Sequence, residues 1–269
     1  MLEIKEVSKV YRPEGQSSPL VAVDNVSLHV KAGEFVSIVG PSGCGKSTLL
    51  EIIGGLSAPS SGIIRLNDQE LRGPHPAVGM VFQEDSTFPW RTVLENVEFG
   101  LETRGVARRE RREKAQAMIN LVGLVGYENL YPAELSGGMR QRVAIARTLV
   151  MSPELILMDE PFGALDEQTR LILGEELLRI WSETRATILF VTHSLDEASM
   201  LSDRVIVMSA RPGRIKALVK VDLPRPRTSE IIASESFSRI TGELWHGLRE
   251  EALKVMAPGR NGPSKGGGT

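Results

Sequence analysis

Apolar and polar residues alternate near the start of the chain, and this pattern predicts β-structure. The alternation covers residues 2–4 and recurs at 26–30, with a Pro/Gly/Ser-rich loop at 12–19 between the two stretches. Residues 34–39 then form a run that is apolar except for Glu34 and Ser37 and that leads directly into a glycine. Such a run predicts a buried strand. A helical pattern from 45 to 54 and a further strand at 62–66 complete this part of the chain.

The second half of the chain alternates between helix and strand patterns. Residues 92–150 have helical periodicity. Short apolar strands then alternate with helices at 155–158, 171–184, 188–191, 196–201 and 205–208. This order predicts an α/β fold whose sheet is largely parallel, with helices on both faces. A proline-rich hinge at 223–227 precedes a last helical segment, 229–255, and a Pro/Gly/Ser/Lys-rich tail that we expect to be disordered.

Composition narrows the possible functions. The chain has 269 residues, 41% of them hydrophobic, and a formal net charge of −2. This near-neutral balance predicts no nucleic-acid partner, and we interpret the arginine-rich segment 104–114, which also contains glutamates, as a solvated helix face. We find no apolar run of about 20 residues and no signal-peptide pattern. The single cysteine, Cys44, excludes an intrachain disulfide and fits a reducing compartment; we expect it to pack rather than to react.

The most specific motif is a glycine-rich loop between the predicted strand 34–39 and the helix after it. It matches the phosphate-binding pattern G-x-x-x-x-G-K-[ST]. Its residues are Gly40, Pro41, Ser42, Gly43, Cys44, Gly45, Lys46, Ser47 and Thr48. Glycines let backbone N–H groups converge on an anion, and the following helix adds its positive end. We expect Lys46 to reach the β- and γ-phosphates of a nucleotide and the Ser47 hydroxyl to bind Mg²⁺.

Two carboxylates follow the apolar strand 155–158. Acidic side chains at the end of such a strand lie at the edge of the sheet where α/β proteins bind ligands. Asp159 is suited to hold Mg²⁺ through water, and Glu160 to position and deprotonate the attacking water.

A third motif identifies the family. Leu135-Ser-Gly-Gly-Met-Arg-Gln-Arg142 resembles the signature of ABC (ATP-binding cassette) proteins. Ser136 can cap the helix that follows, while Gly137 and Gly138 allow a phosphate to approach bare backbone N–H groups. The resemblance covers about residues 1–227. It implies a P-loop NTPase cassette with a mixed or parallel sheet core, an N-terminal antiparallel β subdomain and an α-helical signature subdomain.

The resemblance implies further site residues. Gln83, expected to end a strand at 79–82, matches the glutamine that senses Mg²⁺ and the γ-phosphate. His193 matches the switch histidine that contacts the γ-phosphate, and residues 163–166, ending in Asp166, look like the loop that communicates across a dimer. Tyr11 resembles the aromatic residue that stacks on adenine.

Cassettes of this family pair head to tail, so each ATP lies between the phosphate loop of one copy and the signature of the other. The resemblance therefore implies a homodimer that hydrolyses ATP with Mg²⁺ and drives integral-membrane permease subunits, and indirectly a solute-binding protein. The chain would then lie on the cytoplasmic face of the membrane. Residues 84–90, with Phe88 and Trp90, either form part of the permease groove or pack on the helical subdomain.

Three segments are similar to the nitrate/sulfonate/taurine branch of bacterial importers: 88–93, 209–215 and 222–227. The branch commonly has Leu-Leu where this chain has Thr87-Phe88, which leaves the fit to a permease open. We expect an ATPase domain at 1–227 with a helical subdomain at about 88–150, a helical extension at 228–256 and a disordered tail at 257–269.

Other classes explain the sequence less well. A soluble ABC ATPase acting on ribosomes or DNA typically carries twin cassettes or a long coiled coil, and this chain has room for neither. A small-molecule kinase or GTPase would leave residues 135–142 and His193 unexplained. A subunit of an exporter is the more serious alternative, although exporters often fuse the cassette to membrane helices.

Overall fold

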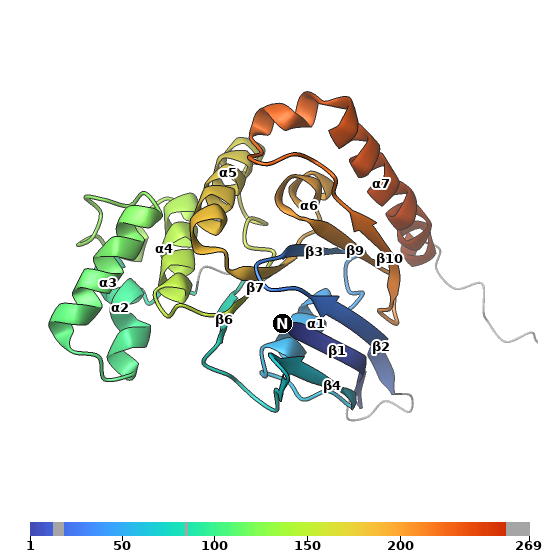
Figure 1. The fold of residues 1–269 in the computed structure, drawn as a ribbon, viewed down its shortest axis with the longest axis horizontal. Helices are drawn as coiled ribbons and strands as arrows, with labels where there is room; N and C mark the ends of the chain where they lie inside the picture. Colours follow the sequence, from blue (N-terminus) through green and yellow to red (C-terminus); the bar gives the residue numbers. More distant parts are fainter. Residues whose placement is uncertain (13–18, 84–85, 257–269) are drawn as a thin grey trace, which may run out of the picture.

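The computed structural model describes residues 1–12, 19–83 and 86–256, which form two β-sheets and their covering helices (Figure 1). One sheet is antiparallel, with strand order β2-β1-β4-β5. Its strands are β1 (Leu2–Tyr11), β2 (Leu20–Val30), β4 (Ser61–Leu66) and β5 (Gln69–Glu70). Most of the predicted loop 12–19 and the whole predicted tail 257–269 lie outside the described residues.

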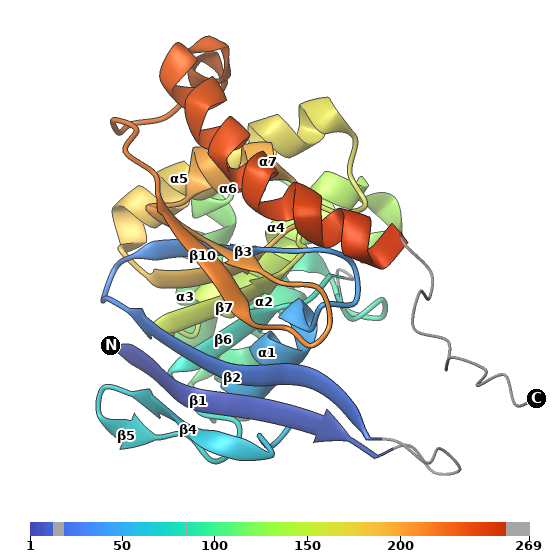
Figure 2. The same ribbon diagram turned by 90° about the vertical axis from the view of Figure 1, so that its right-hand side faces the viewer.

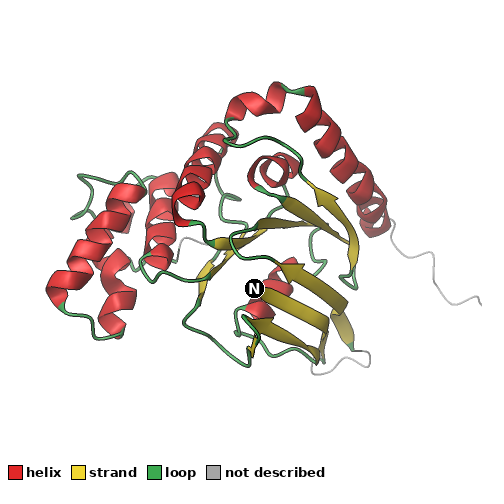
Figure 3. Ribbon diagram, viewed as in Figure 1, coloured by secondary structure: helices red, strands yellow, loops and turns green. Residues whose placement is uncertain are grey.

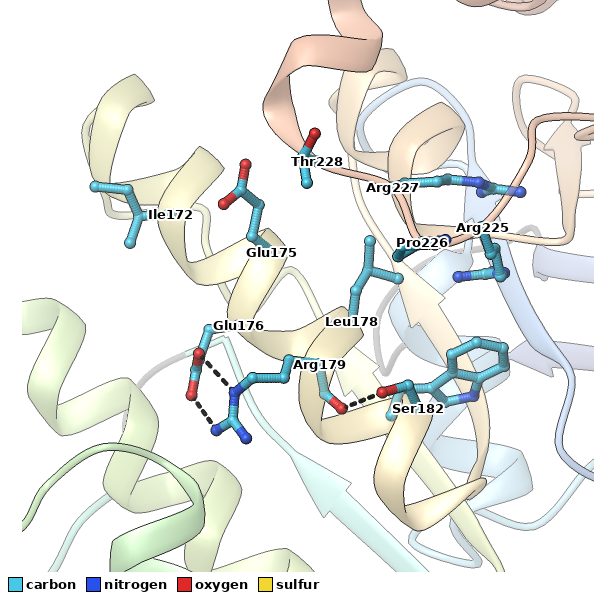
Figure 4. A pocket seen from close by; sticks show the side chains of 11 residues that line it. Ile172, Glu175, Glu176, Leu178, Arg179, Ser182, Arg225, Pro226, Arg227 and Thr228 are labelled. Carbon is cyan, nitrogen blue, oxygen red and sulfur yellow. Dashed lines mark hydrogen bonds and ion pairs between the residues drawn. The ribbon is translucent and has the colours of Figure 1, made fainter.

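The second sheet has the order β10-β9-β3-β8-β7-β6 and is parallel except for its edge strand β10. Its strands are β3 (Phe35–Val39), β6 (Val78–Val81), β7 (Leu155–Asp159), β8 (Thr187–Val191), β9 (Arg204–Met208) and β10 (Ile215–Lys220). Figure 3 shows most helices on one side of this sheet and the antiparallel sheet on the other. The predicted α/β class with an N-terminal antiparallel sheet is confirmed.

Two hydrophobic cores lie on the two faces of the mixed sheet, because successive side chains of a strand point to opposite faces. In β3, Phe35 and Val39 enter the core under the large helices, whereas Val36 and Ile38 enter the core shared with the antiparallel sheet and α1 (Lys46–Ile53). All five residues of β3 are buried, since β8 and β9 also cover its edges. The strand that precedes the glycine-rich loop is thus rigidly held.

A helical region projects from the β6 edge of the mixed sheet, at the left of Figure 1. It contains α2 (Val93–Thr103), α3 (Arg108–Leu121), the short helix Pro132–Glu134 and α4 (Gly137–Leu149). Thr92 begins α2 with a reciprocal capping box to Glu95. The arginine-rich segment is largely α3, and it forms ion pairs such as Arg111 Nε to Glu98 Oε2 at 3.2 Å. Ion pairs within the chain therefore involve Arg109, Arg111 and Arg112.

The C-terminal third differs from the prediction in detail. Helix α5 (Glu167–Thr184) begins four residues before the expected start because Asp166 caps it. After α6 (Leu195–Leu201) and β9, the strand β10 was not predicted, although Lys216, Leu218 and Lys220 alternate there with more buried residues. It pairs antiparallel with β9 at the edge of the sheet.

The last helical segment is not continuous. It consists of a 3₁₀ helix, Ser229–Ala233, and α7 (Glu235–Met256), separated at Ser234. The Ser234 hydroxyl accepts a hydrogen bond from Phe237 N at 3.2 Å and begins the second helix. Figure 2 shows α7 crossing the outside of the molecule beside α6 and the β9–β10 edge. Over the described residues, no helix has the combined length and apolarity that would let it span a bilayer.

Candidate functional site

The glycine-rich loop connects β3 to α1, as the sequence predicted. Its glycines are required by close packing and by backbone conformation. Gly45 has φ 103, and a Cβ there would lie 2.6 Å from the carbonyl oxygen of Ala22 on β2. A Cβ on Gly40 would lie 2.8 Å from Cys44 Sγ. Both contacts are shorter than a real side chain tolerates, so the loop keeps its shape only with glycine at these positions.

Lys46 begins α1 and turns back over the loop. Its Nζ donates to the carbonyl oxygens of Gly40, at 3.0 Å, and Pro41, at 3.3 Å, and the residue is only 6% exposed. The same nitrogen lies 4.0 Å from Glu160 Oε1, at the limit of an ion pair. The lysine charge is therefore concentrated at the mouth of the loop, where an anion would be attracted.

Asp159 lies at the carboxyl end of β7, one strand away from β8 and two from β3. It accepts a hydrogen bond from Ser47 Oγ at 3.1 Å. Burial raises the pKa of Asp159, an effect that the Ser47 hydrogen bond opposes and nearby Glu160 reinforces. Ser47 and Asp159, two of the three residues predicted to bind magnesium, are thus adjacent in space, and the third, Gln83, is described below.

These two oxygen ligands suit Mg²⁺ that is also bound by water and phosphate, rather than a metal whose ligands all come from the protein. Among residues 1–12, 19–83 and 86–256, we find no cluster of three or more histidine, cysteine and acidic side chains that could hold a metal. Mg²⁺ is usually bound through one or two protein oxygens together with water and substrate phosphates. The hydroxyl of Ser47 and the carboxylate of Asp159 have this chemistry.

Glu160 follows β7 with the left-handed backbone angle φ 43, which is unusual for glutamate. Its N–H donates to Val191 O at 2.9 Å and fixes this turn against the end of β8. The carboxylate then lies between two cations or potential cations: Lys46 on one side and His193, whose Nδ1 is 3.3 Å from Glu160 Oε2, on the other. The ends of β3, β7 and β8 therefore bring the predicted catalytic pair together with the phosphate loop.

Another acidic residue near His193, Glu197, was missed by the sequence analysis. Glu197, on α6, accepts a hydrogen bond from Thr192 Oγ1 at 2.5 Å and forms an ion pair with Arg170 Nε at 3.2 Å. Burial raises the pKa of Glu197, although Thr192, Arg170 and His193 favour its charged form. From sequence alone, an acid in the first turn of a helix is explained by the helix dipole. Nothing local revealed its contact with Thr192.

The signature segment begins α4 in the predicted way. Ser136 Oγ accepts a hydrogen bond from Met139 N at 3.3 Å and caps the helix. A Cβ on Gly137 would touch Leu165, and one on Gly138 would lie 3.3 Å from Thr169 Cγ2. The surface hollow beside Ser136 is lined by α4, α5 and residues 123–127, and none of its described lining residues belongs to the phosphate loop. Within one protomer, Ser136 therefore faces a different surface.

Gln83 is placed differently from the prediction. β6 ends at Val81, not at Phe82, because pairing with β7 stops there and the Phe82 side chain is 41% exposed. Gln83 is exposed and lines a hollow together with Gly137 and residues 161–165. The structure thus associates Gln83 with the start of α4 and the segment before Asp166.

Asp166 and Tyr11 have simple local environments. Asp166 caps α5, accepting from Thr169 N at 2.9 Å and from Thr169 Oγ1 at 2.7 Å, and these bonds hold the pKa of Asp166 below its ordinary value. Tyr11 ends β1 opposite Leu20, and Lys9 Nζ lies 5.2 Å from its ring centre. The roles predicted for both residues in a nucleotide site stay predictions.

The cysteine of the loop is buried in the protein core. Cys44 is 1% exposed and belongs to the core between the two sheets. Burial raises the pKa of the Cys44 thiol, which disfavours the reactive thiolate at neutral pH.

Comparisons with known proteins show which family the chain resembles. The model of the family "ABC transporter" matches residues 23–163. An uncharacterised ABC transporter ATP-binding protein of Methanocaldococcus jannaschii is 51% identical over 95% of this chain and 94% of its own length. The nitrate import ATP-binding protein NrtD of Synechocystis is 45% identical over 92% of this chain and 95% of its own length. The aliphatic sulfonates import ATP-binding protein SsuB of Bacillus cereus is 44% identical over 89% of this chain and 92% of its own length.

Solved structures show the same fold. The dimeric structure of a bacterial ABC transporter cassette superposes with a TM-score of 0.73 and 35% identity, over 83% of this chain and all of that one. A post-hydrolysis dimer of the same cassette, bound to ADP and phosphate, gives a TM-score of 0.71 with the same identity and coverage. The chain therefore belongs to the ABC transporter family, as an ATP-binding subunit with ATPase activity.

Proposed function

We propose that this ATPase powers a bacterial importer for a small anionic solute such as nitrate, an alkanesulfonate or taurine. The ATPase step of this proposal is supported by the convergence of Lys46, Ser47, Asp159, Glu160 and His193 at the ends of three adjacent parallel strands. The choice of solute is supported by relatives named for nitrate import and aliphatic sulfonate import.

In this proposal the phosphate loop binds the triphosphate of ATP. Backbone N–H groups of residues 42–48 donate to the phosphate oxygens, and Lys46 moves from its carbonyl partners to the β- and γ-phosphates. Ser47 and Asp159, assisted by Gln83, hold Mg²⁺. When bound, Mg²⁺ neutralises phosphate charge in the transition state. Tyr11 stacks on the adenine.

Hydrolysis then needs a positioned water. Glu160 accepts a proton from that water while the water oxygen bonds to the γ-phosphorus. The bond from this phosphorus to the bridging oxygen then breaks, and ADP is released. The strained backbone of Glu160 fixes the direction of its carboxylate. His193, within hydrogen-bond reach of that carboxylate, orients it and contacts the γ-phosphate.

We propose a head-to-tail homodimer, because the hollow beside Ser136 has no phosphate-loop residue among its described lining residues. In the dimer, Ser136, Gly137 and Gly138 of one copy complete the nucleotide site of the other, and Asp166 lies near the junction. Helix N-termini attract phosphate, so ATP joins the two copies and hydrolysis releases them. The similar cassettes named above are dimers in their own structures.

The permease would contact the aromatic surface after β6. Trp90 is 70% exposed and stacks on Phe88 at 5.6 Å between ring centres, while Phe88 also packs on Phe99 at 4.6 Å. Buried Asn96 fixes this turn by bonding to Phe88 N at 2.8 Å and to the carbonyls of Phe88 and Arg91. Phe88 thus anchors the turn, and Trp90 is available to a partner.

This assignment places residues 1–227 in the ATPase domain, with 88–150 as its helical part and 228–256 as an extension. The chain would act on the cytoplasmic face of the membrane, bound to a permease that receives solute from a solute-binding protein. A chromosomal Glu160→Gln change tests it, with uptake of radiolabelled taurine, an alkanesulfonate and nitrate measured in whole cells. Loss of uptake of one solute supports the proposal. Normal uptake of all three contradicts it.

A further inference from the structure

The turn between β9 and β10 contacts the phosphate loop from outside the nucleotide site. Arg211 donates from Nε and Nη2 to the carbonyl oxygen of Gly43, at 3.2 and 3.1 Å. Two residues later, Gly213 is so close that a Cβ on it would lie 2.0 Å from the carbonyl oxygen of Cys44. The turn therefore touches two successive peptide groups of the loop.

The Gly43–Cys44 peptide is the unit that Arg211 holds. A trans peptide is planar, with its C=O and N–H pointing in opposite directions. The Cys44 N–H therefore points away from the carbonyl that Arg211 holds, and it donates to Pro41 O at 3.3 Å. Gly43 itself has φ 74, a left-handed conformation that glycine adopts without a steric penalty.

The turn does not need Arg211 for its own conformation. Ser209 Oγ donates to Pro212 O at 2.9 Å and accepts from Arg214 N at 3.0 Å, and Ser209 N donates to Arg214 O at 2.9 Å. Arg214 also pairs with Asp24 on β2. The Arg211 side chain is thus an addition to a turn that is already closed.

The C-terminal helix α7 holds the same turn from its other side. Glu251 Oε2 accepts from Ala210 N at 2.8 Å, and its Oε1 lies 3.1 Å from Lys216 Nζ. The side chain of Glu251 is 3% exposed, whereas that of neighbouring Glu250, which also pairs with Lys216, is 72% exposed. Figure 2 shows the end of α7 near this β9–β10 hairpin. One buried carboxylate therefore connects α7 to the residue immediately before Arg211.

We propose that Arg211 is a positioning residue for the phosphate loop, and that α7 sets its position through Glu251, so that the C-terminal helix tunes the affinity for ATP of its own protomer. This proposal rests on the phosphate loop being the ATP site. The path is Glu251, the Ala210 N–H, the Arg211 guanidinium and the Gly43 carbonyl. A displacement of α7 would release the Gly43–Cys44 peptide and weaken the anion-binding shape of the loop.

The first test uses Arg211, whose side chain is on the surface, so its replacement leaves the core intact. In the full chain, Arg211→Gln should raise the KM for ATP roughly three- to tenfold, as expected for loss of charge-assisted hydrogen bonds, with kcat and Tm unchanged. Arg211→Lys keeps the charge without the fork of two donors and should recover only part of the affinity. Arg214→Gln, on the same turn, is the control and should keep the KM of the unaltered chain.

The second test compares the two neighbouring glutamates of α7. Glu251→Gln should raise the KM for ATP in the same direction, while Glu250→Gln should leave it unchanged. The double variant Arg211→Gln/Glu251→Gln should change KM by less than the product of the two single effects, since both act on one path. Circular dichroism melting of each variant shows whether an effect of Glu251→Gln comes from unfolding.

Three outcomes separate the possible failures. If Arg211→Gln has an unchanged KM while Lys46→Ala loses binding of a fluorescent ATP analogue, the positioning role is wrong and the ATP site stands. If Lys46→Ala binds the analogue normally, the phosphate-loop assignment itself is wrong. If Arg211→Gln raises KM but folded Glu251→Gln does not, the link to α7 is overturned.

Discussion

Glu160 Oε2 and His193 Nδ1 lie 3.3 Å apart, although the two residues come from the ends of different strands. The backbone bond from Glu160 N to Val191 O, at 2.9 Å, holds the two strand ends in this relation. A carboxylate fixed next to an imidazole and 4.0 Å from a lysine has the surroundings expected of a group that activates water beside a phosphate.

Replacing Glu160 by Gln should therefore remove turnover and spare binding. The amide keeps the shape of the side chain but cannot accept a proton, so kcat should fall by about 10²- to 10⁴-fold. The affinity for ATP, measured by titration with a fluorescent analogue, should stay within about twofold, since loss of a base alone affects the transition state. Glu167→Gln, in the exposed first turn of α5, is a matched control with normal turnover. Full ATPase activity of Glu160→Gln would exclude this residue as the base.

Ser136→Arg should prevent dimer closure without affecting the nucleotide site of the isolated chain. A large cation at this helix start obstructs the approach of a second copy, while the phosphate loop of the same protomer lies elsewhere. Gel filtration with ATP should then give a monomer that still binds ATP in titration. Ser136→Ala is the comparison, because it removes the hydroxyl and its cap to Met139, at a cost of about 1 kcal/mol, without adding bulk or charge. Loss of ATP binding by the monomeric arginine variant would refute a role in the other copy's site.

The predictions that succeeded rest on local patterns. The run that became β3 is apolar at nearly every position because both faces of the strand are covered, and a glycine-rich turn followed by lysine marks the start of a helix. The same reasoning located Asp159 at a strand end and the Ser136 cap. Each of these features depends on residues within a few positions of one another.

The features that were missed depend on contacts between distant parts of the chain. Arg211 meets Gly43 across 168 positions, and Glu197 on α6 forms an ion pair with Arg170 on α5. The strand β10 is an exception, because its alternating pattern over six residues could have predicted it. Sequence patterns report which face a residue occupies and not which segment lies opposite.

Gly45→Ala should destabilise the protein more than a left-handed backbone angle alone explains. At Gly45, the new Cβ would meet Ala22 O at 2.6 Å in addition to the strain of φ 103. Gly105→Ala is the control, since φ is 72 there but the space around it is open. We expect a loss of about 1 kcal/mol of unfolding free energy in the control and at least about 2 kcal/mol more in Gly45→Ala. Urea unfolding measures the free-energy loss of each variant. Equal losses would show that the contact with β2 relaxes without destabilising the protein.

Removing Mg²⁺ should stop hydrolysis, and Asp159→Asn should raise the Mg²⁺ concentration needed to restore it. The amide keeps an oxygen that can accept from Ser47, now at 3.1 Å from the carboxylate, but it loses the negative charge that attracts the cation. After treatment with EDTA, Mg²⁺ is added stepwise and ATP hydrolysis is measured. The original chain should regain activity at a Mg²⁺ concentration at least about tenfold lower than the variant needs, which corresponds to about 1.4 kcal/mol in cation binding. Asp68→Asn, in the turn between β4 and β5, should titrate like the original chain, because asparagine tolerates its left-handed backbone angle, φ 66. Identical Mg²⁺ curves for Asp159→Asn and Asp68→Asn would mean that the pair of Ser47 and Asp159 does not hold the cation, whatever its proximity to the phosphate loop.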